Sequence, residues 1–147
     1  MTTKKRILIV DDEEPIRFAL TTILQDQGYE VDASDTGNAG LKKLEENRYN
    51  IVLLDYNLPD INGLEVAQKA REIDKDVPIV FISAYGTTDV ILRAVRLGAF
   101  DFIEKPIHSE DLFSAIDRWS ATRKEQTEKT LEKIKKALSA DLDQEVK

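Results

Sequence analysis

The feature that most constrains the fold is a fivefold alternation of short apolar runs with stretches of helical periodicity. The runs begin near residues 7, 29, 51, 79 and 100. Three of them, 7–10, 51–54 and 79–82, are apolar at every position, which is typical of strands buried on both faces of a parallel sheet. Strands that are joined through helices pair in parallel. The chain therefore predicts an α/β fold with a doubly wound, five-stranded parallel sheet.

The run at 29–34 alternates apolar with polar residues, which predicts a half-exposed strand at the edge of the sheet. A helix is expected from about residue 36 to 47, with Ser34 or Asp35 as its N-cap and two glycines lowering its helix propensity. The other residues expected to begin or end helices are Pro15, Gly28, Thr87 or Thr88, Gly98 and Ser109.

Right-handed crossovers allow the strand order 2-1-3-4-5, the flavodoxin-like (βα)5 arrangement, in which ligands bind where the chain direction reverses. The first and third strands flank that point, and both end in acid: Asp11 and Asp12 follow the first, and Asp55 follows the third. Ser83 ends the fourth strand and Lys105 follows the fifth. Each residue alone is equally well explained as a loop acid, a cap or a surface lysine, but their convergence on one edge favours a site.

Three carboxylates in one crevice need a cation. Two of them about 5 Å apart repel by roughly 3 kcal/mol at an effective dielectric of about 20, so three pairs approach ~10 kcal/mol, comparable with the stability of a whole domain. The available ligands are oxygens, since the chain has no cysteine and its only histidine is His108. A hard ion such as Mg²⁺ is favoured. A carboxylate beside Mg²⁺, a hydroxyl and a lysine can accept a phosphoryl group.

These residues resemble the receiver domain of two-component response regulators over about residues 4–121. The matching positions are Asp11, Asp12, Asp55, Leu58, Pro59, Gly63, Ser83, Ala84, Lys105 and Pro106. The resemblance implies that Asp55 accepts a phosphoryl group from a sensor histidine kinase. It also implies that Asp11, Asp12, Asp55 and the backbone carbonyl of Asn57 bind Mg²⁺, or Mn²⁺ in its place, and that Lys105 holds a phosphoryl oxygen.

The resemblance further implies a phosphorylation-dependent signalling switch. Ser83 would move toward a phosphoryl oxygen and Phe102 would turn with it, although many receivers carry Thr and Tyr at these positions, and Phe102 has no hydroxyl. Asn57 and Tyr85 flank the site at positions that tune the lifetime of the acyl phosphate. The implied protein is a regulatory domain, not an enzyme in its own right, that takes part in its own phosphoryl transfer and acyl-phosphate hydrolysis.

Three other functions compete with this interpretation. A phosphatase of the haloacid dehalogenase type places its nucleophile on the first strand with a second Asp two residues later, whereas Asp55 is on the third strand and is followed by Asn57. A flavodoxin-like domain needs a phosphate cradle after the first strand, where this chain has four acids. A degenerate receiver usually lacks one of the five site residues, and none is missing here.

Composition sets the expected context. The net charge of −7 argues against direct nucleic-acid binding by this chain. No apolar run is long enough to cross a bilayer or to form a signal peptide, so we expect a soluble protein that does not enter membranes. The absence of cysteine is compatible with a reducing compartment, and the cytoplasm is the default expectation.

Residues 122–147 are expected to form a charged helical extension of the receiver, or alternatively a frayed tail. Leu131, Ile134 and Leu138 return at helical spacing after a polar stretch. The extension is similar to that of receivers in enhancer-binding transcriptional activators. We expect a homodimer formed through this helix and the face made by the fourth helix, fifth strand and fifth helix. We also expect a cis peptide bond before Pro106, because cis is accessible mainly at X–Pro bonds.

Overall fold

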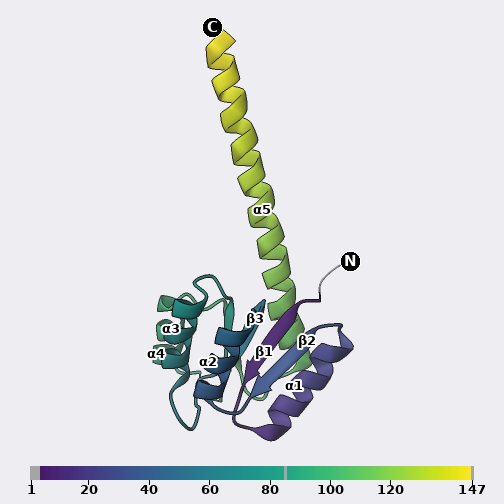
Figure 1. The fold of residues 1–147 in the computed structure, drawn as a ribbon, viewed down its shortest axis with the longest axis vertical. Helices are drawn as coiled ribbons and strands as arrows, with labels where there is room; N and C mark the ends of the chain where they lie inside the picture. Colours follow the sequence, from purple (N-terminus) through teal and green to yellow (C-terminus); the bar gives the residue numbers. More distant parts are fainter. Residues whose placement is uncertain (1–3, 85, 147) are drawn as a thin grey trace. The chain divides into compact units, whose positions relative to one another are not determined.

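The computed structural model describes residues 4–84 and 86–146, with only the backbone for 120–130, 133 and 140–146. Along these residues strands and helices alternate five times (Figure 1): β1 Arg6–Val10, α1 Glu14–Asp26, β2 Glu30–Ser34, α2 Gly37–Glu46, β3 Ile51–Asp55, α3 Gly63–Ile73, β4 Ile79–Ser83, α4 Thr88–Arg96, β5 Asp101–Glu104 and α5 Ser109–Val146. The chain divides into two compact units, residues 1–111 and 112–147.

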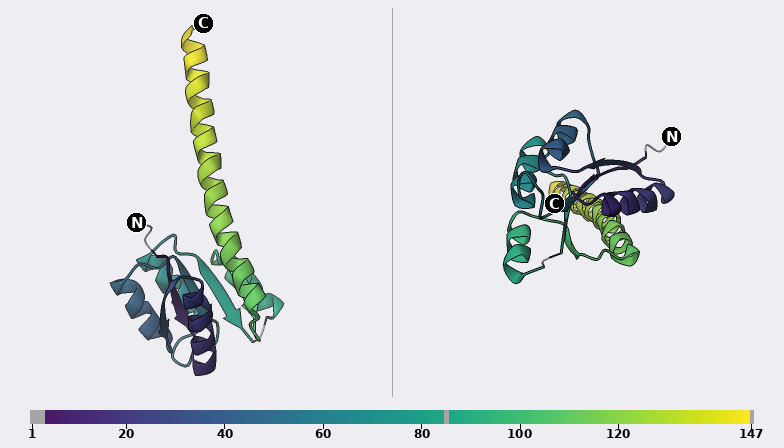
Figure 2. Two further views of the ribbon diagram at one scale, coloured as in Figure 1. Left: turned by 90° about the vertical axis from the view of Figure 1, so that its right-hand side faces the viewer. Right: turned by 90° about the horizontal axis from the view of Figure 1, so that it is seen from below.

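The strands form one parallel sheet in the order β2-β1-β3-β4-β5. This confirms the predicted fold class and strand order, with β2 at an edge. Val10 pairs with Leu54, and Asp55 with Ile82, so β1, β3 and β4 end at nearly the same level. Helix α1 lies on one face of the sheet and α2, α3 and α4 on the other (Figure 2).

The apolar core fills the space between the sheet and α2, α3 and α4. Its buried residues include Leu8, Val10, Leu54 and Phe81 from the strands, and Leu41, Leu44, Val66, Ala67 and Ala70 from the helices. Burying a side chain of the size of Leu or Phe stabilises a fold by about 1.5–3 kcal/mol. This core therefore fixes the strand ends that carry the candidate site.

The two glycines of α2 have a packing role that propensity alone did not suggest. A Cβ on Gly40 would lie 2.7 Å from Val10 Cγ2, and one on Gly37 would lie 2.7 Å from Ile61 Cγ1 and Val66 Cγ2. Both positions are closer than real Cβ contacts allow. The glycines lower helix propensity but let α2 approach β1 and its neighbours.

The predicted N-cap of α2 is wrong. Neither Ser34 nor Asp35 caps the helix; the Thr36 hydroxyl accepts the N–H of Ala39 at 3.1 Å. Asp60 accepts two more N–H groups of the first turn, from Gly37 at 2.9 Å and Asn38 at 2.8 Å. The first N–H groups of a helix have no partner within the helix, and two of them are bound here by the carboxylate of Asp60, 22 and 23 residues away in the sequence. No local sequence pattern reveals this contact.

Helix α5 is continuous from Ser109 to Val146, as the charged extension predicts. Leu112, Ile116 and Trp119 in its first turns are buried. Further along, Leu131, Ile134 and Leu138 are 53%, 51% and 60% exposed. Among the described residues, no helix is both long and apolar enough to cross a membrane.

Helix α4 also exposes apolar residues. Ile91, Leu92 and Val95 are 36%, 49% and 64% exposed, whereas Ala94 is buried. The Thr87 hydroxyl accepts the N–H of Val90 at 3.3 Å and begins the helix, and Gly98 follows its end at φ +76°. Helix α4 therefore has a well-defined beginning and end but contributes little to the core.

Candidate functional site

The structure brings the acids predicted at the ends of the first and third strands together at one edge of the sheet. Asp11 directly follows β1 and Asp55 ends β3, and both are buried, while the adjacent Asp12 is exposed. These three residues each offer a carboxylate oxygen, and the three oxygens lie within 4.8 Å of one another. The strand register explains this arrangement, because β1 and β3 are neighbours that end together. Carboxylates far apart in the sequence are thereby held in one crevice.

Lys105 supplies the positive charge of the site. Its Nζ lies 3.0 Å from Asp11 Oδ2 and 3.1 Å from Asp55 Oδ2, and its side chain is only 12% exposed. The backbone N–H of Lys105 donates to the carbonyl of Ser83 at 2.8 Å, which aligns the end of β5 with that of β4. The peptide bond between Lys105 and Pro106 is cis, as predicted.

Glu13 is a residue of this site that the sequence analysis missed. Its Oε2 accepts a hydrogen bond from Lys105 Nζ at 2.9 Å. The signal that could have pointed to it is the run of four acids from Asp11 to Glu14 directly after β1. Spacing could not show which of the later acids turns back toward the crevice.

Burial and charge shape the acid–base properties of this cluster. Burial of Asp55, helped by the nearby Asp11 carboxylate, raises the pKa of Asp55 from 3.8 to about 6. Burial alone would lower the pKa of Lys105, but its hydrogen bond to Glu13 and its proximity to Asp11 and Asp55 raise that pKa above its usual value. Lys105 therefore stays protonated, and it only partly neutralises the surrounding carboxylates.

The residues present fit a hard divalent cation. Asp11 Oδ2 is buried and has no hydrogen-bond partner among the described residues; Lys105 Nζ lies at ion-pair distance without hydrogen-bond geometry. A buried carboxylate oxygen without a hydrogen bond is costly unless another positive group binds it. With Asp12 and Asp55 beside it, the ligand set consists of oxygens, which is the preference of Mg²⁺.

The other predicted site residues differ in their surroundings. The backbone N–H of Asn57 donates to Asp55 Oδ1 at 3.1 Å, while its side chain is exposed. Ser83 is buried, and Phe102 is half-buried and packs against the core cluster. Tyr85, predicted to flank the site, lies outside the described residues.

Gly63 explains how α3 can begin so close to the end of β3. A Cβ at this position would lie 2.6 Å from the Asp55 carbonyl oxygen and 2.7 Å from Tyr56 Cα. The N–H of Gly63 donates to the Tyr56 carbonyl at 2.7 Å. The absent side chain thus permits direct backbone packing behind Asp55.

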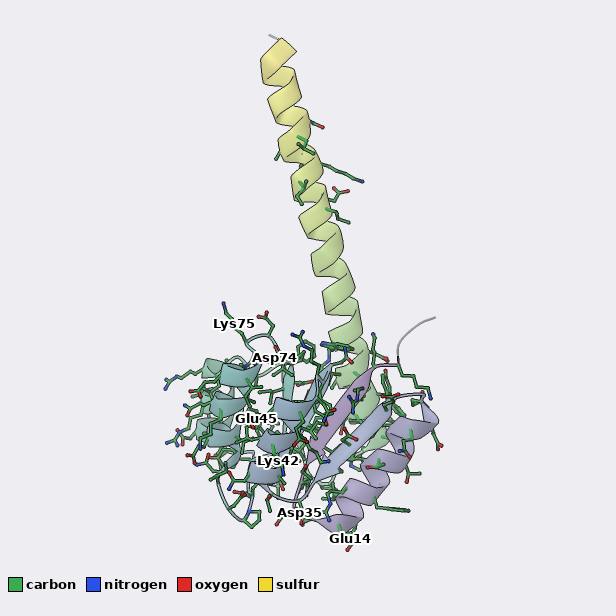
Figure 3. The ribbon with its side chains drawn as sticks, in the orientation of Figure 1. Glu14, Asp35, Lys42, Glu45, Asp74 and Lys75 are labelled. Atoms are coloured by element: carbon green, nitrogen blue, oxygen red, sulfur yellow. The ribbon has the colours of Figure 1, made fainter. Side chains whose placement is uncertain are left out.

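A cavity of about 360 Å³ lies far from this chemistry, at the amino-terminal edge of the sheet. Its lining includes Glu45, Asp74 and Lys75, which are labelled in Figure 3. These residues come from the end of α2 and the segment before β4. The carboxylate crevice, not this cavity, places the buried Asp11 and Asp55 carboxylates beside the largely covered ammonium of Lys105.

A family model described as the response regulator receiver domain matches residues 7–117. The chain belongs to this family. Membership confirms the resemblance inferred from the site residues, and it is consistent with phosphorylation-dependent switching by this receiver domain.

Relatives and solved structures agree with the family assignment. The receiver domain is 38% identical over 111 residues to the transcriptional regulatory protein DltR of Streptococcus agalactiae, covering 76% of this chain and 50% of DltR. A CheY-like receiver domain from Methanospirillum hungatei is 33% identical with a TM-score of 0.79, covering 84% of this chain and 99% of that one. The response regulator TrrA of Thermotoga maritima, solved in complex with Mg(2+)-BeF, is 36% identical with a TM-score of 0.71, covering 78% and 98%.

This receiver domain spans only half the length of DltR. DltR is named a transcriptional regulatory protein, so the comparisons do not support the expectation that nucleic acid is not contacted.

Proposed function

We propose that this chain is the phosphorylation switch of a two-component response regulator, and that Asp55 accepts a phosphoryl group from a sensor histidine kinase. The observation that carries the proposal is the buried Asp55 carboxylate, hydrogen-bonded to Lys105 and within reach of the Asp11 and Asp12 oxygens. A structure of its relative TrrA in complex with Mg(2+)-BeF supports the same use of the crevice here.

The transfer needs few groups. An oxygen of the Asp55 carboxylate attacks phosphorus while the bond from phosphorus to the donor's nitrogen or oxygen breaks, and the donor leaves with that electron pair. Lys105 holds a phosphoryl oxygen through its ammonium. Asp11, Asp12, Asp55 and the backbone carbonyl of Asn57 would hold Mg²⁺, or Mn²⁺ in its place. When bound, this ion screens the repulsion between the carboxylate and the anionic donor.

Labelling with a small phosphodonor tests this function. Wild-type protein incubated with acetyl phosphate should gain one phosphoryl group in Mg²⁺ and none in EDTA, measured as intact mass. Labelling without any metal would favour a different chemistry. Absence of labelling in Mg²⁺, with the fold intact by circular dichroism, would favour a flavodoxin-like binding module or a degenerate receiver. Rapid release of inorganic phosphate from many other phosphate esters would favour a phosphatase.

We also propose that the signal passes from Ser83 to Phe102. Ser83 would turn toward a phosphoryl oxygen and leave space that the half-buried Phe102 ring enters. Completing the burial of a ring that is already half-buried is worth at most about half of the ~1.5–3 kcal/mol for full burial, that is about 0.8–1.5 kcal/mol. That free energy shifts a two-state equilibrium by about fourfold to tenfold, which biases the neighbouring face without making an all-or-none switch. The acyl phosphate then hydrolyses at a rate that Asn57 and Tyr85 tune.

The proposed output is self-association through α4, β5 and α5. The exposed apolar residues Leu131, Ile134 and Leu138 recur at helical spacing and can pair with a second copy. Truncation after Thr122 should therefore weaken dimerisation by at least about tenfold, because three half-exposed apolar side chains lose their partners. Sedimentation of full-length and truncated protein, with and without beryllofluoride, measures this. Monomers in all four samples would exclude the proposed dimer.

A further inference from the structure

The ammonium of Lys105 is crowded by anions. Lysine has three N–H donors, and three carboxylates lie around Nζ: Glu13 at 2.9 Å, Asp11 at 3.0 Å and Asp55 at 3.1 Å. Phosphorylation of Asp55 would replace one carboxylate charge by a phosphoryl group carrying about two, so the negative charge around Lys105 increases. Glu13 and Asp55 already accept hydrogen bonds from Nζ, and a phosphoryl oxygen would compete with them for the ammonium.

The three partners differ in how easily they can leave. Asp11 and Asp55 are 0% and 3% exposed at their side chains, so separating either from Lys105 would strand a buried charge. Asp55 is in addition the proposed covalent attachment point. The Glu13 side chain is 54% exposed and can return to water at little cost.

The backbone places Glu13 for this role. Asp11 Oδ1 accepts the N–H of Glu13 at 2.8 Å, which fixes the turn that follows β1. Glu13 is also the N-cap residue of α1, and its side chain makes no capping hydrogen bond. A released Glu13 carboxylate therefore remains beside the positive end of the α1 dipole, which offsets part of the cost of leaving Lys105.

We propose that Glu13 is a positioning residue that holds Lys105 in the unphosphorylated protein and is displaced from it by a phosphoryl oxygen. This inference rests on the proposed function of Asp55. No covalent bond changes at Glu13: a Lys105 N–H exchanges one acceptor for another. Glu13 thus orders Lys105 in the resting state while competing with the phosphoryl group for it.

Removing the charge of Glu13 should strengthen phosphoryl binding. In Glu13→Gln the competing anion is neutral, and loss of a half-exposed ion pair of this kind should tighten beryllofluoride binding by about two- to fivefold. Glu14→Gln is the matched control. Glu14 is the adjacent exposed acid, begins α1, forms no ion pair among the described residues and is labelled in Figure 3. The Glu14→Gln substitution removes the same formal charge as Glu13→Gln without changing the environment of Lys105.

The experiment is a fluorine NMR titration of the full chain with beryllofluoride at saturating Mg²⁺, for wild type and both variants. A second readout, in metal-free protein, is the nitrogen NMR signal of the Lys105 ammonium, which should shift in Glu13→Gln and not in Glu14→Gln. High salt should reduce the affinity difference, since it screens the exposed pair.

The outcomes separate the two claims. Tighter binding in Glu13→Gln alone, with the shifted ammonium signal, supports the displacement. Equal affinities in the two variants, or weaker binding in Glu13→Gln, would overturn it while leaving Asp55 as the acceptor. If folded wild-type protein binds no beryllofluoride, the proposed function fails, and the role of Glu13 fails with it.

Discussion

Replacing Lys105 by Met is expected to lower the free energy of unfolding by about 3–5 kcal/mol at pH 7 in metal-free buffer. Such a loss is typical when one partner of a buried ion pair is removed and the other charges stay behind. Here the stranded groups are Asp11 and Asp55, both almost fully buried. The methionine side chain preserves most of the apolar contacts of the lysine stem, so the loss reports the charge.

Urea unfolding in EDTA measures this effect, with Lys42→Met as the control. Lys42 is an exposed lysine on α2, labelled in Figure 3, and its substitution should change stability by less than about 0.5 kcal/mol. Saturating Mg²⁺ should restore part of the stability lost in Lys105→Met. Equal stabilities of the two variants would show that Lys105 does not stabilise the fold by neutralising the buried carboxylates of Asp11 and Asp55.

Replacing Asp55 by Asn should have the opposite effect and raise the free energy of unfolding of the metal-free protein above pH 6. The pKa of Asp55 is raised from 3.8 to about 6 in the folded protein. Between these values the folded state holds a proton that the unfolded state has released, so Asp55 causes stability to fall as pH rises. A shift of about two pKa units corresponds to about 3 kcal/mol, which Asp55→Asn should recover.

The comparison is between wild type and Asp55→Asn from pH 4 to pH 8 in EDTA. The stability difference should be small near pH 4, grow through pH 5 and be constant above about pH 6 to 7. An ion that binds only the folded state stabilises it. Mg²⁺ should therefore stabilise the wild type more than the variant, which lacks the proposed Asp55 ligand. A difference that does not change with pH would mean that the Asp55 carboxylate is not destabilised by its surroundings.

The fold and the centre of the site follow from the sequence because both depend on repeated, simple patterns. Three runs apolar at every position require a buried parallel sheet, and the acids at 11, 12 and 55 lie directly at the ends of two such strands. Once β1 and β3 are neighbours, their carboxylates meet. Strand position was therefore enough to bring together residues more than 40 positions apart.

The features that were missed involve contacts between residues far apart in the sequence, in part together with local hydrogen bonds. Glu13 turns toward Lys105 because Asp11 accepts its N–H, and α2 is capped by Thr36 with help from the distant Asp60. Likewise, Gly40 has a low helix propensity, but the absence of a side chain there leaves the space that the Val10 side chain occupies. At Gly40, tertiary packing thus outweighs the local helix propensity.

Mass spectrometric mapping of the phosphorylated residue shows whether Asp55 is the phosphoryl acceptor. Protein treated with acetyl phosphate and Mg²⁺ is reduced with borohydride, digested and sequenced, and Asp55→Asn is treated in parallel. We expect the modification to lie at Asp55, to require Mg²⁺ and to be absent from the variant. A full equivalent of phosphate on Asp55→Asn, or a wild-type modification that maps to any other residue, would contradict it.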